Sequence, residues 1–203
     1  MERTADTGAQ PFYAESAERL GKVYESVSFE SVHGPLIDLI PDAPARVLDV
    51  GAGTGRDATA LARRGFLVDA VEPVAELRGV AARLHPDSGV TWRAGGLPAL
   101  DGIQGPYDVV LLSAVWMHLL PEDRPVAMRC LASLLAPEGV LLITLRHGEP
   151  PADRRMFDIP PDEVARHAAE AGLSVLRTVN GEADHLGREA VHWSSVALGR
   201  NQS

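Results

Sequence analysis

Short apolar runs alternate with amphipathic stretches along most of this 203-residue chain, and that alternation constrains the fold more than any other feature. From residue 46 onward we predict strands at 46–50, 66–71, 90–93, 108–113 and 139–145, and helices at 57–64, 74–84, 121–135 and 161–171. Repeated strand–helix units favour a mostly parallel sheet with right-handed crossovers.

Two last predicted strands, 173–179 and 191–198, have no helix between them, and Asn180–Gly181 indicates a turn. A pair joined only by a loop must be antiparallel, because a parallel return needs a long crossover. We therefore predict an α/β fold: a doubly wound, mostly parallel, Rossmann-like seven-stranded sheet with one antiparallel strand. Ligands bind such sheets at the carboxyl ends of the strands, here beside the first strand.

The first 43 residues have a different pattern. Residues 1–11 are predicted to be a loose polar tail, and two helices follow, at 14–27 and near 32–39, before the linker Pro41–Pro44. We place a boundary here, with an N-terminal tail and helical segment at 1–43 and a ligand-binding domain at 44–203.

Composition excludes several partners. The formal net charge of −9 disfavours a polyphosphate backbone, so no nucleic-acid partner is expected. The chain has no signal peptide pattern, no apolar run long enough to cross a membrane, and no metal-binding motif. The single cysteine, Cys130, fits a reducing compartment, and we expect a cytoplasmic protein.

Three alternate glycines, Gly51, Gly53 and Gly55, stand between the first strand and its helix. Such a loop lets a ligand approach bare backbone, although alone it is either structural or a site for any nucleotide-like ligand. Arg56 occupies the position where the dinucleotide fingerprint needs a small residue, which disfavours a nicotinamide cofactor. Asp49 precedes the loop inside an apolar strand and needs partners there, either a cationic ligand or the loop amides.

Glu72 ends the second strand, 21 positions after Gly51. An acid at this place can accept hydrogen bonds from ribose hydroxyls. The alternative is a solvated glutamate at a strand end, but strand, glycine loop, helix, strand and acid together favour the ribose role.

These segments resemble the class I methyltransferases that use S-adenosylmethionine. The resemblance is carried by Leu48–Gly55 (LDVGAGTG), Val71–Pro73, Tyr107–Ser113 and Leu135–Ile143. It implies that residues 51–55 hold the amino-acid part of the cofactor, that Glu72 holds the ribose, and that Ser113 and Ala114 lie beneath it. An acid that often follows the third strand in this family is missing, so adenine would rest on Gly96 and Leu97. The complete expected cofactor set is Tyr24, Asp49, Gly51, Ala52, Gly53, Thr54, Gly55, Glu72, Pro73, Gly96, Leu97, Ser113 and Ala114.

The resemblance places the methyl acceptor after the fourth strand. There Trp116 and Met117 can line an apolar pocket, and His118 is either a general base or a positioning residue. We also expect His147, after the fifth strand, to face the acceptor. The resemblance also implies that the helical segment within 1–43 closes over the cofactor as a lid. Tyr13 either contacts the acceptor from this lid or packs on the sheet. The other histidines, His33, His85, His167, His185 and His192, are expected to be ordinary surface or loop residues.

Arg146 precedes His147 and has two interpretations. It either attracts an acidic acceptor or pairs with a surface carboxylate, and the second is favoured from sequence.

The predicted function is transfer of a methyl group from S-adenosylmethionine to an O or N atom of a small, partly apolar molecule. The expected partner is that small acceptor, with no nucleic acid or membrane, and the protein is a monomer or homodimer. The alternative is a non-catalytic sensor or assembly subunit that binds S-adenosylmethionine, because fold does not settle function. A nicotinamide-dependent oxidoreductase is a third, disfavoured class.

Overall fold

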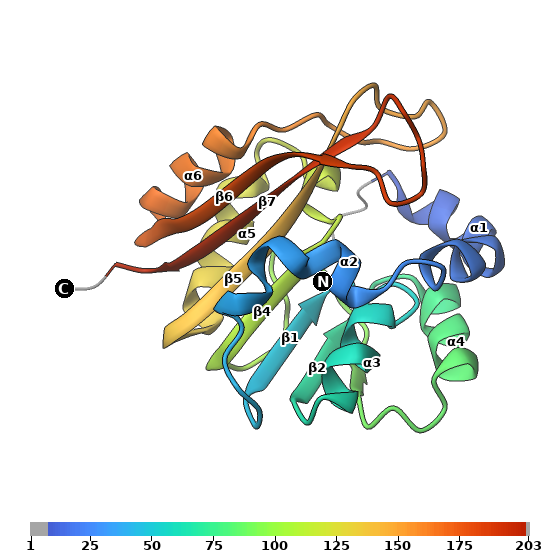
Figure 1. Cartoon of the computed structure of the whole chain (residues 1–203), viewed down its shortest axis with the longest axis horizontal. Helices are drawn as coiled ribbons and strands as arrows, with labels where there is room; N and C mark the ends of the chain where they lie inside the picture. Colours follow the sequence, from blue (N-terminus) through green and yellow to red (C-terminus); the bar gives the residue numbers. More distant parts are fainter. Residues whose placement is uncertain (1–7, 202–203) are drawn as a thin grey trace.

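The computed structural model describes residues 8–201, which form a seven-stranded sheet flanked by helices (Figure 1). The strands are β1 (Arg46–Val50), β2 (Leu67–Val71), β3 (Thr91–Arg93), β4 (Tyr107–Ser113), β5 (Leu135–His147), β6 (Leu173–Ala183) and β7 (His192–Arg200). Their order is β3-β2-β1-β4-β5-β7-β6, with β1 to β5 parallel and β7 antiparallel to both its neighbours. The predicted doubly wound sheet with one antiparallel strand is confirmed.

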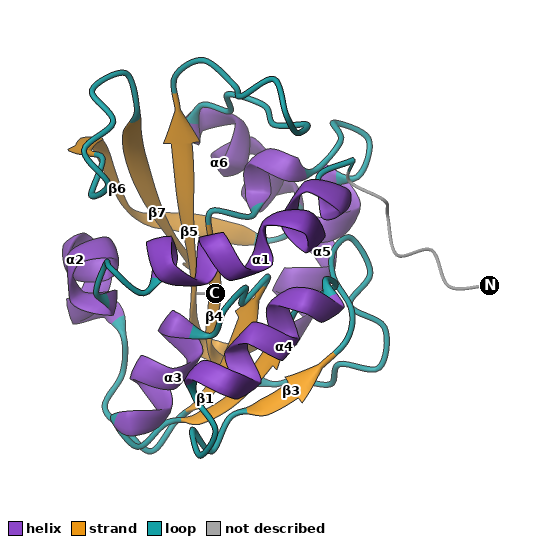
Figure 2. Ribbon diagram, turned by 90° about the vertical axis from the view of Figure 1, so that its right-hand side faces the viewer, coloured by secondary structure: helices purple, strands orange, loops and turns teal. Residues whose placement is uncertain are grey.

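Helices cover both faces of the sheet, so the central strands are mostly apolar (Figure 2). They are α1 (Gln10–Tyr24), α2 (Phe29–His33), α3 (Arg56–Arg63), α4 (Ala75–Leu84), α5 (Arg124–Leu134) and α6 (Pro161–Glu170), with 3-10 helices η1 (Gly34–Leu39) and η2 (Trp116–His118). Side chains of β4 alternate between two cores: Val109 and Leu111 pack with α3, and Val110 and Leu112 pack with α5 and α6.

The N-terminal helix starts earlier than predicted. We expected a polar tail through residue 11 and a helix over 14–27, but α1 spans Gln10–Tyr24. Pro11 is compatible with this start, because the first helical turn needs no amide donor at that position. Residues 1–7 of the predicted tail lie outside the described part. Through Ala17, α1 packs against Val74 and against Leu77 of α4.

Two further predictions need correction. The single helix expected near 32–39 is α2 followed by η1, with Pro35 in the first turn of the 3-10 segment. The turn expected at Asn180–Gly181 is instead a bulge within β6. Val179 and Glu182 are three positions apart on β6, whereas their partners on β7, Ser195 and Trp193, are two positions apart. Gly181 has φ +75°, a conformation that glycine adopts easily and that suits a bulge. The chain reverses later, between residues 184 and 191.

Candidate active site

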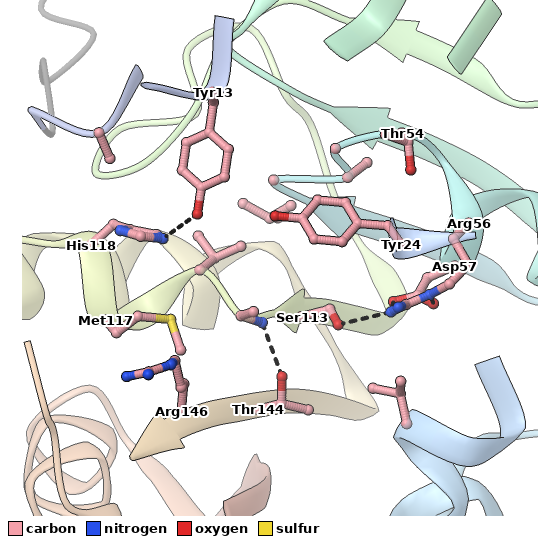
Figure 3. A pocket seen from close by; sticks show the side chains of 18 of the residues that line it. Tyr13, Tyr24, Thr54, Arg56, Asp57, Ser113, Met117, His118, Thr144 and Arg146 are labelled. Atoms are coloured by element: carbon pink, nitrogen blue, oxygen red, sulfur yellow. Dashed lines mark hydrogen bonds and ion pairs between the residues drawn. The ribbon is translucent and has the colours of Figure 1, made fainter. Parts of the chain in front are cut away.

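A pocket of about 260 Å³ lies at the carboxyl ends of β1, β2, β4 and β5. That volume is many times the ~30 Å³ share of one water molecule, so the pocket has room for an organic ligand. Helix α1 contributes Tyr13 and Tyr24 to its lining, and the β6–β7 hairpin lines it from the other side. Figure 3 shows both tyrosine rings directed into this space.

The glycine loop turns sharply between β1 and α3, with φ of +72° at Gly51, +57° at Gly53 and +86° at Gly55. A Cβ on Gly51 would lie 2.5 Å from Val115 Cγ2, and a Cβ on Gly55 would lie 2.9 Å from Trp92 Cζ2. At Gly53 a Cβ would meet nothing within 4 Å. Packing therefore requires two of the glycines, and the third leaves backbone open on the pocket wall.

Glu72, just after β2, is 4% exposed and braces this loop. Its Oε2 accepts a hydrogen bond from Gly53 N at 2.9 Å, and its Oε1 accepts one from Val74 N at 2.8 Å. Burial raises the pKa of Glu72, and the two amide hydrogen bonds, which lower it, offset this only in part. The carboxylate thus lines the pocket beside the glycine loop.

Asp49 lies at the base of the pocket and is 1% exposed. Neither of its carboxylate oxygens accepts a hydrogen bond of normal geometry among the described residues, although a weaker interaction with the backbone amide of Ala58 favours the charged form. Burial raises the pKa of Asp49 well above its usual range, and the charge of Asp57 adds to the effect. The loop amides that we considered as partners do not take that role, so Asp49 has unused hydrogen-bonding capacity facing the pocket.

A buried ion-pair network lies behind Asp49 and corrects one prediction. His33, expected at the surface, is 1% exposed, and its Nε2 lies 3.0 Å from Asp57 Oδ2. Arg56 Nε and Nη2 donate to the same carboxylate at 2.6 and 2.7 Å. Burial alone would raise the pKa of Asp57, but His33 and Arg56 outweigh it and hold that pKa well below its usual range. Arg56 Nη2 also reaches Ser113 Oγ at 3.4 Å, which ties α3 to the end of β4 (Figure 3).

The chain segment after β4 is held in an unusual conformation. Ala114 has φ +59°, which is uncommon for a residue other than glycine and costs about 1 to 3 kcal/mol. Its amide donates to Thr144 Oγ1 on β5 at 2.9 Å, which stabilises this conformation. The strained residue lies in the pocket lining, where backbone strain often accompanies function.

His118 and Tyr13 meet at the opposite wall (Figure 3). His118 Nδ1 lies 2.9 Å from the carbonyl oxygen of Arg155, and because a carbonyl only accepts, Nδ1 carries the hydrogen. Nε2 is then the acceptor for the Tyr13 hydroxyl at 2.9 Å. Burial lowers the pKa of His118 and raises that of Tyr13. The pair is therefore a neutral imidazole and a neutral phenol joined by one hydrogen bond.

Most of the residues predicted for the site lie together in the pocket lining. They are Tyr13, Tyr24, Asp49, Gly51, Ala52, Gly53, Thr54, Glu72, Pro73, Gly96, Leu97, Ser113, Ala114, Met117 and His118. Three predicted residues do not line it. Gly55 faces Trp92, and Trp116 is fully buried, with its ring centroid 6.4 Å from that of His167. His147 is held by Asp158 Oδ1 at 2.7 Å and Ser194 Oγ at 2.9 Å. We correct the acceptor site accordingly and remove Trp116 and His147 from it.

The pocket also contains residues that sequence reasoning missed. They are Arg154, from the loop after β5, and several hairpin residues: Glu182, Asp184, His185, Leu186, Arg188, Trp193 and Ser195. Arg146 of β5, for which pairing at the surface was favoured, also lines the pocket. No local motif marks the hairpin residues, because they reach the pocket only through the insertion of β7 between β5 and β6. His185 was expected to be an ordinary loop residue and instead lines the pocket.

Within residues 8–201, no three His, Cys, Asp or Glu side chains are arranged to hold a metal ion. In the same part of the chain, no helix combines the length and the apolar character needed to cross a membrane.

Sequence comparison finds methyltransferases among the proteins similar to this chain. An uncharacterized methyltransferase of Oceanobacillus iheyensis is 27% identical over 132 residues, which is 65% of this chain and 61% of that protein. The chain spans about three fifths of the length of the first curated relatives it matches.

Solved structures share the fold over the whole chain. The Burkholderia thailandensis 1,6-didemethyltoxoflavin N1-methyltransferase, solved with 1,6-didemethyltoxoflavin and S-adenosylhomocysteine, has a TM-score of 0.73 and 20% identity and covers 100% of this chain and 92% of its own. The magnesium protoporphyrin IX methyltransferase of Synechocystis PCC 6803, solved with S-adenosylmethionine, has a TM-score of 0.75 and 18% identity and covers 99% and 100%. Residues 29–198 match the sequence model of a methyltransferase domain family. The chain belongs to this methyltransferase family.

Proposed function

We propose that this protein transfers a methyl group from S-adenosylmethionine to an O or N atom of a small, partly apolar molecule. The observation that carries the proposal is the open glycine loop with the Glu72 carboxylate beside it, within one pocket. Family membership supports the reaction, and the two solved relatives carry S-adenosylmethionine or its product. Both of these proteins are named for small-molecule substrates, 1,6-didemethyltoxoflavin and magnesium protoporphyrin IX, which supports a small acceptor.

The residues present fit this cofactor. The Asp49 oxygens, which accept no hydrogen bond of normal geometry among the described residues, suit its ammonium group, and the open face of Gly53 admits the amino-acid part close to the backbone. We assign the ribose to Glu72 and Pro73, and adenine to Gly96 and Leu97, all of which line the pocket. The remaining assigned cofactor contacts are Tyr24, Gly51, Ala52, Thr54, Ser113 and Ala114, with Gly55 shaping the loop.

When bound, the cofactor supplies a methyl group activated on a sulfonium. The protein then has to orient the acceptor, exclude water and accept a proton where the acceptor carries one. We assign proton acceptance to His118, because its Nε2 carries the lone pair. In the structure Nε2 accepts a hydrogen bond from the hydroxyl of Tyr13, and both residues line the pocket. Tyr13 and Met117 line the acceptor side, and α1 acts as a lid over it. We further propose that the protein acts in the cytoplasm as a monomer or homodimer.

The test is incubation with S-adenosylmethionine and a panel of small phenols, carboxylic acids and amines. We expect S-adenosylhomocysteine and a methylated product with at least one acceptor, and a loss of turnover in Asp49→Ala. Arg177→Gln is the control, because Arg177 is paired with Asp38 on the surface. Tight cofactor binding with no turnover across the panel would favour the sensor or assembly-subunit alternative, and absence of binding would overturn the proposal.

A further inference from the structure

The wall of the pocket opposite the glycine loop is built from one face of β5, β7 and β6. Thr144 and Arg146 are two positions apart on β5 and therefore face the same side. Their register partners on β7 are Ser195 and Trp193, and Glu182 of β6 pairs with Trp193. All five line the pocket. We call this surface the acceptor wall.

The acceptor wall is separate from the cofactor loop. In the sheet order, β4 lies between β1 and β5, so the ends of β1 and β5 are two strand spacings, or about 10 Å, apart. Thr144 adjoins the cofactor half through its hydrogen bond to Ala114, and Arg146 lies farther along β5. Figure 3 draws Arg146 on the opposite side of the view from Thr54.

Arg146 has no carboxylate partner among the residues that the structure describes. Its Nη1 donates to the carbonyl oxygens of Gly148 and Glu149 at 3.2 Å, and its Nε is buried without an acceptor. The sequence-based preference for a surface ion pair is therefore wrong. Burial and the nearby positive charges of Arg188 and Arg154 lower the pKa of Arg146, and the charges of Asp184 and Asp158 offset this only in part.

The other charges on this side of the pocket nearly balance. Asp184 is paired with Arg188 at 2.6 Å and also accepts from Trp193 Nε1 at 2.9 Å. Glu182 accepts from Ser195 Oγ. Arg154 is paired with Asp153 at 2.8 Å. Arg146 is therefore the one arginine of this part of the pocket lining without a carboxylate partner among the described residues. A cation in this position attracts a ligand of the opposite sign.

We propose that the methyl acceptor is a small monoanion whose carboxylate is bound by Arg146 on the acceptor wall. A guanidinium whose Nη1 is engaged elsewhere keeps its Nε–Nη2 edge, and that edge matches the two oxygens of a carboxylate. A single unpaired guanidinium matches the one charge of a carboxylate better than that of a phosphate ester, which carries about −1.5 to −2. Trp193, Met117 and Met156 line the same pocket and suit an apolar or aromatic body on this acid. The inference rests on the proposed function, because it names the class of acceptor for that reaction.

The test is calorimetric binding to protein saturated with S-adenosylhomocysteine. The probes are a panel of aromatic and medium-chain aliphatic acids, each paired with its primary amide and with the corresponding phosphate ester where one exists. We expect at least one acid to bind about tenfold or more tightly than its amide, as the loss of a charge-assisted hydrogen bond implies. That preference should disappear in Arg146→Gln. It should be only partly restored in Arg146→Lys, because lysine keeps the positive charge but lacks the planar pair of N–H donors that binds both carboxylate oxygens.

Two readouts separate this inference from the proposed function. S-adenosylhomocysteine affinity is measured first in each variant, and we expect it to stay within about twofold of wild type in Arg146→Gln, which also shows that the variant is folded. Arg177→Gln, an exposed arginine paired with Asp38 outside the pocket, is the matched control and should keep the acid preference. Failure of S-adenosylhomocysteine to bind wild type overturns the proposed function. Binding of S-adenosylhomocysteine with no acid preferred, with a phosphate ester preferred, or with the preference intact in Arg146→Gln overturns the carboxylate site.

Discussion

Replacing Asp49 by asparagine should stabilise the protein while weakening its cofactor binding. The carboxylate is 1% exposed, neither oxygen accepts a hydrogen bond of normal geometry among the described residues, and the negative charge of Asp57 lies nearby. Leaving a buried polar group unsatisfied costs about 1 to 3 kcal/mol, and more when the group is charged. Asparagine keeps the size and removes the charge, but its amide is also unsatisfied, so we expect a gain of about 1 to 2 kcal/mol at pH 7.

The pH dependence separates this explanation from a general packing effect. Because the folded pKa of Asp49 is raised, the folded state holds its proton longer than the unfolded state, where the pKa is about 3.9. The contribution of Asp49 to wild-type stability therefore declines as pH rises above about 4, by up to ~1.4 kcal/mol per unit until its folded pKa is reached. The advantage of Asp49→Asn should be smallest near pH 4 and largest at neutral pH.

The assay is urea unfolding of wild type and Asp49→Asn at pH 4, 5.5 and 7, with Asp42→Asn as a control for an exposed acid. S-adenosylhomocysteine affinity is measured on the same samples, and we expect it to fall at least about tenfold, since charged hydrogen bonds contribute about 1.5 to 3 kcal/mol. A variant that is less stable at neutral pH, or a difference that does not change with pH, would refute this account of Asp49.

Three further predictions concern the loop, the network behind it and the acceptor side. Gly53→Ala and Gly102→Ala should each lower stability by about 1 to 2 kcal/mol, because both glycines have a positive φ and an added Cβ would meet no other atom within 4 Å. Only Gly53→Ala should weaken S-adenosylhomocysteine binding in calorimetry, since only Gly53 lines the pocket. Asp57→Asn should lower the free energy of unfolding by about 3 to 5 kcal/mol, because it leaves buried His33 and half-buried Arg56 without their carboxylate. A loss under about 1 kcal/mol in urea titration would contradict the network. Because the pKa of His118 is lowered, the unfolded state takes up a proton on this imidazole first as pH drops through about 6.5, so the contribution of His118 to stability should fall there. A nuclear magnetic resonance titration placing the His118 pKa at or above about 6.5 would be evidence against this.

The sheet and the cofactor half of the site could be predicted from sequence because their signals are local. Gly51, Gly53 and Glu72 follow apolar strands in a short stretch of chain, and parallel strands bring their carboxyl ends to one edge. The family resemblance assigned those same residues their roles, which stay proposals for direct measurement.

The acceptor half could not be predicted in the same way. Arg146 was misjudged because its lack of a carboxylate partner depends on how β5 and the β6–β7 hairpin meet, and no spacing in the sequence encodes that. His33 was misjudged for a similar reason, since its partner Asp57 is 24 positions away. Asn180–Gly181 carries the residues of a tight turn, yet pairing with β7 on either side makes it a bulge.

The most direct test of the central claim is calorimetric titration of S-adenosylhomocysteine into wild type, Glu72→Ala and Glu72→Gln. We predict tight binding to wild type that weakens at least about tenfold in Glu72→Ala, because two charged hydrogen bonds to the ribose are lost. Glu72→Gln keeps the shape and one acceptor and should lie between the two. Equal affinity in all three proteins would contradict the assignment of Glu72, and with it the reading of this pocket as the cofactor site.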